Sequence, residues 1–380
     1  MNYKDKICVI TGAASGIGYA TTKLLKEMEA KIYALDVNKV DIEGIEFIET
    51  NLNNKESIDK AFNIIPKHID CFFGVAGVSG VKTNYYDTFT INYISNKYIT
   101  ETYLKNRMSI GGAITYVTSV AGSYWDKYAK EYLAFTKAKT WEEMQEALHN
   151  QANPDTIGMM AYPLSKRAMN HYASEMAITL GEKGIRVNAL LPASTATGMK
   201  EEFERAAGGE DALLSQTGIA RRLATSEEMA KPLIFLNSDW ASYISGTMLT
   251  VDYGNDALIK LGMKKDRLDV KVGSKIYNMG FFQNMLKKQL EEVEVKEEKD
   301  LTEEVMPYNE EISTVTAEEI FIENDKNDTT NLDEGLSKED VQNDILIPYN
   351  DEISTVVDED LMPYNDSIST IMKEGTNEAN

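Results

Sequence analysis

A tyrosine and a lysine four residues apart are the first candidates for chemistry in this sequence. They are Tyr162 and Lys166 in the stretch YPLSK, which reads as the start of a helix. Side chains at positions i and i+4 of a helix share one face, so the phenol and the ammonium would point the same way. Free tyrosine has a pKa of about 10, too high for an efficient base at neutral pH, and a nearby cation favours its phenolate. The spacing alone does not separate a proton-transfer pair from an aromatic and a cation that share a helix face.

A glycine-rich turn near the N-terminus indicates a dinucleotide site. TGAASGIG follows the strand-like run KICVIT, so Gly12, Gly16 and Gly18 would let the backbone turn tightly and approach a pyrophosphate at a helix N-terminus. Asp36 ends the next strand-like run, where a carboxylate accepts hydrogen bonds from the adenosine ribose and repels a 2′-phosphate. Residues 13–15 are Ala-Ala-Ser and offer no base to hold that phosphate. The pattern favours NAD over NADP, although a solvated acid at a strand end would also account for Asp36.

The glycine-rich turn and the tyrosine–lysine pair together resemble the motifs of the short-chain dehydrogenase/reductase family, over about residues 1–258. The resemblance implies catalytic roles for Asn92, Ser119, Tyr162 and Lys166. Ser119 would hold the substrate oxygen and Tyr162 would exchange its proton. Lys166 would hold the nicotinamide ribose, and Asn92 would anchor a water molecule for the proton path. The implied cofactor contacts are Gly12, Ser15, Gly16, Ile17, Gly18, Asp36, Asn51, Leu52, Ala76, Gly77, Tyr162, Lys166, Thr195 and Thr197.

One turn departs from the family pattern. Where the family usually has Asn-Asn-Ala-Gly, this chain reads GVAG, which keeps Ala76 and Gly77 but lacks both asparagines. The hydrogen bonds that stabilise this turn must therefore come from another part of the chain.

Alternating strand-like and helix-like runs must position these residues. Alternation of this kind is typical of a parallel sheet with helices on both faces. We therefore expect a Rossmann-type doubly wound α/β domain over residues 1–261. The expected strands cover residues 6–11, 31–36, 45–50, 71–77, 112–119, 185–192 and 246–252, and a helix that carries Asn92 is expected over residues 88–104.

An insertion separates Ser119 from Tyr162 by 43 positions, where the family usually has one strand-to-helix loop. It covers about residues 123–155, and Thr140 with Glu143 forms a possible capping box. We expect a small helical subdomain beside the active site. The insertion resembles that of bacterial 3α-hydroxysteroid dehydrogenase/carbonyl reductases, and coniferyl-alcohol dehydrogenases look similar here. In that branch the insertion is associated with a dimer, which implies a homodimer.

The C-terminal third of the chain differs sharply in charge. The net charge is −22, and residues 262–380 hold 30 of the 61 acids but 12 of the 39 bases. Such an acidic balance argues against nucleic-acid binding. Residues 262–290 are a basic amphipathic linker or helix, either docked on the domain or bound to a partner or membrane surface. Residues 291–380 are acidic and low in apolar content, as in disordered tails.

Three copies of one short segment, with the pattern PYN-x-x-IST, stand in this tail. They read MPYNEEISTV, IPYNDEISTV and MPYNDSISTI, and the spacers between them differ in length, unlike those of a solenoid. Multivalent docking motifs for a protein partner gain avidity, whereas duplication without function is the alternative.

The expected activity is an NAD-dependent oxidoreductase that interconverts a secondary alcohol and a ketone on a bulky hydrophobic substrate, with a 3-hydroxysteroid or bile acid favoured. The alternatives are an aromatic (coniferyl-type) alcohol dehydrogenase and a nucleotide-sensing scaffold that acts through its tail repeats. The histidines lack metal-ligand spacing, so we expect no metal. The N-terminus has no signal-peptide layout and no apolar run reaches membrane-spanning length, which favours a cytoplasmic protein.

Overall fold

The computed structural model describes residues 1–151 and 156–271, and its main sheet has seven strands, all parallel. The strand order is β3-β2-β1-β4-β5-β6-β9, so the chain runs outward from β1 to β3 and then returns to β4 on the other side of β1. This confirms the Rossmann-type, doubly wound prediction. A crevice forms at such a reversal, at the carboxyl ends of the strands. The strands are β1 Ile7–Thr11, β2 Lys31–Asp36, β3 Glu46–Glu49, β4 Ile69–Gly74, β5 Met108–Val117, β6 Arg186–Pro192 and β9 Met248–Val251.

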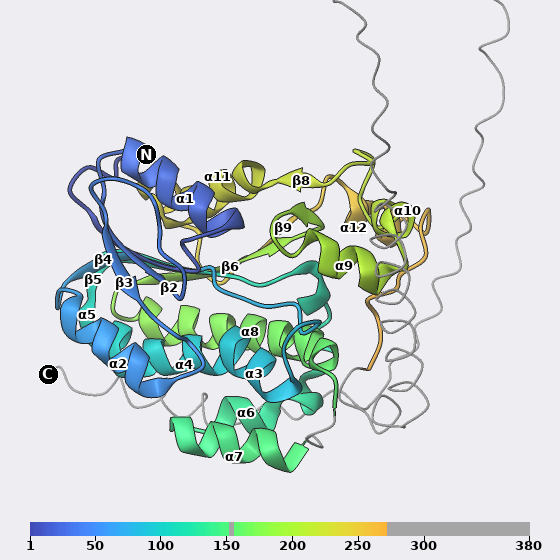
Figure 1. Ribbon diagram of the computed structural model, residues 1–380, viewed down its shortest axis with the longest axis horizontal. Coiled ribbons are helices and arrows are strands. Elements are labelled where there is room, and N and C mark those ends of the chain that lie inside the picture. Colours follow the sequence, from blue (N-terminus) through green and yellow to red (C-terminus); the bar gives the residue numbers. More distant parts are fainter. Residues whose placement is uncertain (152–155, 272–380) are drawn as a thin grey trace, which may run out of the picture. The chain divides into compact units, whose positions relative to one another are not determined.

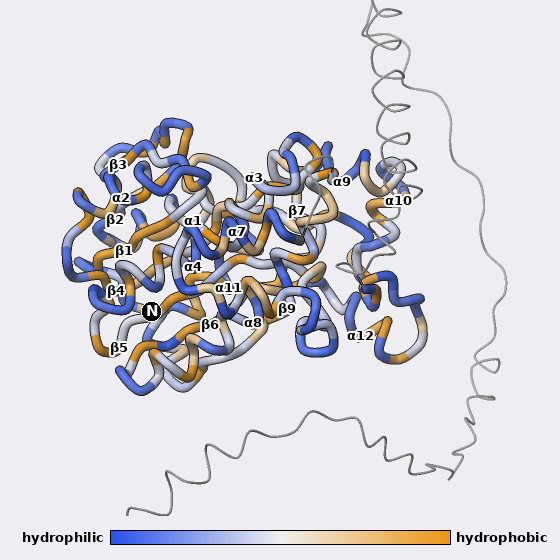
Figure 2. The backbone as a smooth tube through the Cα atoms, turned by 90° about the horizontal axis from the view of Figure 1, so that it is seen from below, coloured by the Kyte–Doolittle hydropathy of each residue, from blue (hydrophilic) through white to orange (hydrophobic). Residues whose placement is uncertain are grey.

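Helices cover both faces of the sheet (Figure 1). Helices α1 (Gly16–Glu27) and α11 (Ser226–Asn237) lie on one face, and α2 (Lys55–Ile64) and α8 (Gly158–Gly181) lie on the other. The side chains of β1 alternate between the two cores: Cys8 and Ile10 pack toward α1 and α11, and Val9 packs on the opposite side. Figure 2 shows hydrophobic stretches along the strands and hydrophilic loops around them.

The helix expected over residues 88–104 is present and is longer than expected. It consists of α3 (Tyr85–Phe89), a π-helical turn (Thr90–Ile94), α4 (Ser95–Ile99), a second π-helical turn (Thr100–Leu104) and α5 (Lys105–Arg107). π-helical turns often occur at functional sites.

The insertion is helical, as expected, but none of its described residues from 123 to 151 lines the cavity at the sheet's carboxyl edge. Its helices are α6 (Leu133–Lys137) and α7 (Trp141–Gln151), which follow a 3₁₀ turn (Ala129–Glu131). They lie against the outer side of α3, α4 and α8 (Figure 1). Aromatic contacts fix them there, because Trp141 meets the Tyr98 ring edge-on and His149 stacks on Tyr86.

The capping prediction for α7 is half correct. The Thr140 hydroxyl accepts a hydrogen bond from the Glu143 backbone N–H at 3.1 Å, as expected of an N-cap. The Glu143 carboxylate reaches back to the N–H of Lys139, one residue before the position that a capping box requires.

Shorter elements follow β6. They are β7 (Thr195–Ala196), α9 (Lys200–Ala207), α10 (Glu210–Leu214), β8 (Ala224–Thr225) and α12 (Asn255–Lys260), with a 3₁₀ turn at Asp239–Ala241. Another 3₁₀ turn, Val120–Gly122, follows β5. Residues 262–271 form turns and irregular backbone. The rest of the predicted basic segment, the acidic tail and all three repeats lie outside the described residues.

No helix in the described part of the chain combines the length and the apolar character needed to cross a lipid bilayer.

Candidate active site

A cavity of about 680 Å³ opens at the carboxyl ends of β1, β4, β5 and β6. Every residue proposed from the sequence as a cofactor contact lines it, and so does Ser119. Asn92 alone among the proposed site residues is absent from its lining. The fold therefore brings together residues that lie up to 185 positions apart, from Gly12 to Thr197.

The glycine-rich turn has the conformation that a pyrophosphate site requires. Gly12 has φ +72°, and a Cβ there would stand 2.7 Å from the Ala76 Cα, so only glycine fits. A Cβ at Gly18 would stand 1.9 Å from the Gly12 carbonyl oxygen, so this glycine allows α1 to pack on the turn. The first turn of α1 carries no acidic side chain, which leaves its positive end suited to an anion.

Asp36 joins the end of β2 to the glycine-rich turn. Its Oδ2 accepts a hydrogen bond from the Ala14 N–H at 2.9 Å, and its Oδ1 accepts one from the Asn38 N–H at 2.9 Å. The carboxylate is therefore fixed while it lines the cavity. Among the described residues that line this cavity, Lys166 is the single lysine or arginine, and it lies on α8, whereas Asp36 ends β2.

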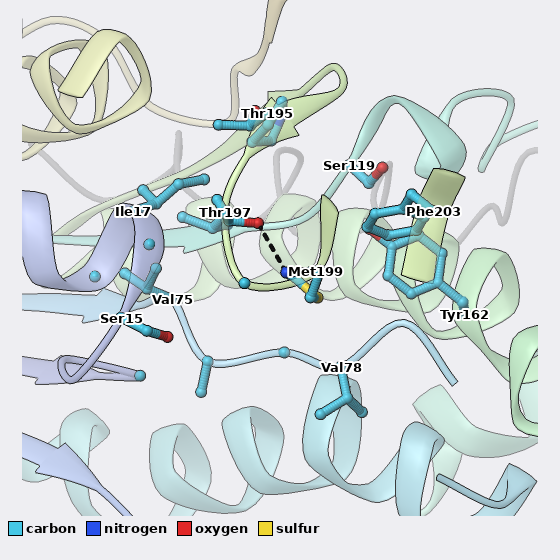
Figure 3. Close-up of a pocket in the computed structure, with 18 of the residues that line it drawn as sticks. Ser15, Ile17, Val75, Val78, Ser119, Tyr162, Thr195, Thr197, Met199 and Phe203 are labelled. Carbon is cyan, nitrogen blue, oxygen red and sulfur yellow. Dashed lines mark hydrogen bonds between the residues drawn. The ribbon is translucent and has the colours of Figure 1, made fainter. Parts of the chain in front are cut away.

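Ser119 and Tyr162 lie near each other at the other end of the cavity (Figure 3), and Lys166 lines the same cavity. Burial raises the pKa of the Tyr162 phenol, and a hydrogen bond with the Ser119 hydroxyl lowers it. Burial lowers the pKa of Lys166 to about 8. The Lys166 Nζ donates to the Val117 carbonyl oxygen at 3.1 Å and lies 5.6 Å from the centre of the Tyr162 ring. The expected one-turn spacing on α8 thus directs both groups toward the end of β5.

Asn92 lies buried in the first π-helical turn, and its side-chain amide forms two hydrogen bonds with the backbone of Val78. Its Oδ1 accepts from the Val78 N–H at 2.9 Å, and its Nδ2 donates to the Val78 carbonyl oxygen at 3.0 Å. A third bond reaches the Ser165 hydroxyl at 3.2 Å. The side chain thereby fixes the segment after β4 against α8, and its contact with water stays a prediction.

The turn that lacks the family's asparagines is held from β1. The Thr11 hydroxyl oxygen accepts hydrogen bonds from the N–H groups of Val75 (3.1 Å) and Ala76 (3.2 Å). Strand β4 ends at Gly74, three residues earlier than the sequence suggested, so residues 75–77 leave the sheet and line the cavity.

The sequence reasoning missed the wall that α9 and α10 supply. Met199, Phe203, Ala206 and Leu213 all line the cavity. The Phe203 ring meets the Tyr162 ring edge-on, with centroids 5.4 Å apart (Figure 3). The sequence did carry a pattern that predicts this wall, because Met199, Phe203 and Ala206 recur at the spacing of one helix face.

A carboxylate on α9 joins this helix to the loop after β4. Glu202 accepts a hydrogen bond from the Ser79 hydroxyl, and its Oε1 lies 3.1 Å from the Lys82 ammonium. Because Glu202 also lines the cavity, the contact fixes α9 at the cavity wall.

Comparisons with known proteins identify the family of this chain. Residues 6–157 match the profile of the short chain dehydrogenase family, and residues 144–256 match that described as Enoyl-(Acyl carrier protein) reductase. The chain is 28% identical over 261 residues to the coniferyl-alcohol dehydrogenase of Pseudomonas sp. (strain HR199), covering 67% of this chain and 98% of the relative. It is 28% identical over 256 residues to the 3-alpha-hydroxysteroid dehydrogenase/carbonyl reductase of Comamonas testosteroni, with the same coverage.

A solved structure shares the fold. It is the 3-alpha-hydroxysteroid dehydrogenase from Pseudomonas sp. B-0831 complexed with NADH, with a TM-score of 0.57 and 22% identity. The match covers 67% of this chain and 99% of that one.

Proposed function

Because the chain belongs to the short-chain dehydrogenase family, we propose that it is an NAD-dependent oxidoreductase that interconverts a secondary alcohol and a ketone. The observation that carries the proposal is the convergence of Ser119, Tyr162 and Lys166 in one cavity with the glycine-rich turn. A family relationship alone leaves the chemistry open, since folds host many functions.

NAD fits the residues at the other end of the cavity. The glycine-rich turn and the start of α1 would hold the pyrophosphate, and Asp36 would accept hydrogen bonds from the adenosine ribose. Asn51 and Leu52 would contact the adenine, and Thr195 and Thr197 would contact the nicotinamide and phosphate groups. The relative from Pseudomonas sp. B-0831 carries NADH in its crystal structure, which supports the same cofactor here.

Ser119, Tyr162 and Lys166 each have a separate role in the proton transfer. Ser119 holds the substrate oxygen, and the Tyr162 phenolate takes the hydroxyl proton during oxidation. Lys166 favours the phenolate through its charge, and its ammonium has donors left for the nicotinamide ribose after the bond to Val117. When bound, NAD supplies the acceptor for the hydride that leaves the carbinol carbon. In reduction Tyr162 returns the proton as an acid.

The substrate class is a bulky hydrophobic alcohol. Apolar side chains at the start of α9 and in α9 and α10 line the same cavity as the reacting groups, among them Met199, Phe203 and Leu213. We favour a 3-hydroxysteroid or a bile acid, supported by the Comamonas relative, which is named a hydroxysteroid dehydrogenase. An aromatic alcohol of the coniferyl type is the second candidate, supported by the relative from Pseudomonas sp. (strain HR199) at the same identity. It is a primary alcohol, so the same hydride transfer would give an aldehyde in place of a ketone.

A cofactor and substrate screen tests the proposal. Purified full-length protein is mixed with NAD or NADP and a panel of 3α- and 3β-hydroxysteroids, a bile acid, coniferyl alcohol and cyclohexanol, and NADH or NADPH formation is followed by absorbance. We expect turnover with NAD and the highest kcat/KM on a steroid or bile acid. Cofactor binding without turnover of any panel member would instead favour a nucleotide-sensing scaffold.

We further propose a cytoplasmic homodimer whose tail repeats dock on a protein partner. Sedimentation velocity of the full chain tests the dimer, and a single species of 42.6 kDa would refute it.

An immobilised IPYNDEISTV peptide tests the docking of the tail repeats against a scrambled control of the same composition. The docking idea fails if the two peptides retain the same proteins.

A further inference from the structure

Leu268 lines the cavity although it lies beyond the last strand and helix of the domain. It shares the cavity lining with Tyr162 and Phe203, and it belongs to the irregular segment that follows α12. Figure 1 shows this segment in orange, running from α12 toward the start of α8. The carbonyl oxygen of Leu268 accepts a hydrogen bond from Arg167, the residue that follows Lys166, so Leu268 lies beside the part of α8 that carries the candidate catalytic pair.

A buried arginine next to the candidate catalytic lysine holds this segment. Arg167 is 1% exposed and donates from Nη2 to the Leu268 carbonyl oxygen at 2.9 Å and from Nη1 to the Val270 carbonyl oxygen at 2.8 Å. The two carbonyls flank residue 269, so the guanidinium fixes the backbone on both sides of it. Hydrogen bonds from charged donors are stronger than neutral ones, which suits an anchor.

The same arginine joins the segment to the insertion. Its Nε donates to the Ser123 carbonyl oxygen at 3.2 Å, and its guanidinium lies 4.5 Å from the centre of the Tyr128 ring. Its Nη1 also lies 3.4 Å from the Glu131 carboxylate. Arg167 therefore connects α8, the first part of the insertion and the segment around Leu268.

Side chains of the insertion hold the segment directly as well. The Tyr124 hydroxyl donates to the Asp266 carboxylate, and the Tyr128 hydroxyl donates to Oδ1 of Asp269 at 2.6 Å. The Lys127 ammonium lies 2.7 Å from Oδ2 of the same Asp269. The described insertion residues do not line the cavity, so we expect them to influence the substrate indirectly, by positioning this segment.

We propose that residues 264–271 form a wall of the substrate site, with Leu268 as a specificity-determining side chain that the insertion and Arg167 position. The proposal rests on the proposed function, because it assigns part of the substrate site of the same reaction. It gives the insertion a role in substrate choice that acts through contacts to the C-terminal segment.

The first test changes the side chain alone in the full-length protein. Leu268→Ala is compared with wild type and with Leu261→Ala, the same change at a residue that is 74% exposed and outside the cavity lining. The probes are a 3α-hydroxysteroid and cyclohexanol, which is a one-ring secondary alcohol. We expect Leu268→Ala to lower the steroid-to-cyclohexanol ratio of kcat/KM about tenfold, since contacts of this size discriminate by such factors. Leu261→Ala should leave the ratio unchanged.

The outcomes separate the two proposals. Absence of wild-type turnover with every member of the substrate panel would refute the proposed function and this inference with it, whereas turnover of other panel members but of neither probe would refute this inference alone. Wild-type turnover with the same ratio in Leu268→Ala would refute the role of Leu268 alone. NADH affinity, measured by fluorescence titration, should match wild type in all variants, because Leu268 is expected to contact the substrate.

The second test loosens the segment without touching the cavity lining. Asp269→Asn weakens the contacts to Lys127 and Tyr128, and Asp256→Asn is the control, since it weakens an exposed ion pair on α12. We expect Asp269→Asn to raise the KM for the steroid several-fold with little change in kcat for cyclohexanol. Equal KM values in Asp269→Asn and Asp256→Asn would overturn the positioning role of the insertion.

Discussion

Ser119 distinguishes the Tyr162–Lys166 pair from any other aromatic and cation that share a helix face. The sequence placed Tyr162 and Lys166 one helical turn apart, and the structure brings the Ser119 hydroxyl to the same phenol. The neighbourhood of a tyrosine with a raised pKa, a lysine with a lowered pKa and a hydroxyl is typical of a functional site.

The pH dependence of the two reaction directions should be opposite. Oxidation needs the Tyr162 phenolate, so its kcat/KM should rise with pH, whereas reduction needs the phenol and should fall as pH passes the Tyr162 pKa. Because the hydrogen bond with Ser119 lowers that pKa, Ser119→Ala should shift the rise in oxidation to higher pH and reduce kcat about 100-fold. Ser174→Ala, farther along α8, is the control. An unshifted profile in Ser119→Ala would contradict this assignment.

Asp36 should decide between NAD and NADP. Its carboxylate lines the cavity, and the described residues that line the cavity include no lysine or arginine besides Lys166, so we expect wild type to prefer NAD about 100-fold in kcat/KM. Asp36→Ala combined with Val37→Arg should reverse or abolish the preference, because repulsion is removed and a cation added. The loss of acceptors for Ala14 and Asn38 should also lower stability by about 1–3 kcal/mol. Equal use of both cofactors by wild type would contradict the role of Asp36.

At the scale of elements, the sequence predicted the strands better than the contacts between them. Alternating runs sufficed for the parallel sheet and for the long helix that carries Asn92. The support that Thr11 gives to the turn after β4 could not be predicted, because it crosses between strands 64 positions apart. The position of the insertion could not be predicted from the sequence either, because its aromatic contacts to α3 and α4 join residues that are distant in the chain.

Thr11 provides a direct test of how β1 supports the cavity. Thr11→Val keeps the shape of the side chain but leaves the Val75 and Ala76 N–H groups without their acceptor. We expect a loss of about 1–3 kcal/mol in the free energy of unfolding, measured with urea, and weaker NADH binding. Thr11→Ser keeps the hydroxyl and should stay closer to wild type in NADH affinity. Wild-type NADH affinity in Thr11→Val would show that the turn needs no such support.

At the scale of the molecule, the catalytic domain continues past its last helix. The sequence placed the domain end at residue 261, whereas contacts from Arg167 and the insertion extend to Val270. The sequence left open whether residues 262–290 dock on the domain, and it did not indicate a role for Leu268, because the partners of this segment are distant in the chain.

Removal of the acidic tail should leave the enzyme active. Deletion of residues 291–380 keeps the segment around Leu268, so we expect kcat and KM within about twofold of wild type, measured by NADH formation. A collapse of turnover would show that the tail contributes to the folded enzyme. If turnover is unchanged and the shortened protein no longer binds the proteins that the IPYNDEISTV peptide retains, the repeats act as docking motifs.

The central claim is that Tyr162 transfers the substrate proton in an NAD-dependent alcohol oxidation. The most direct measurement is steady-state NADH formation by wild type and Tyr162→Phe on the best substrate of the panel, with NADH affinity measured in parallel. We predict a loss in kcat of about 1,000-fold in Tyr162→Phe with NADH affinity retained. Equal turnover by the two proteins would contradict the mechanism.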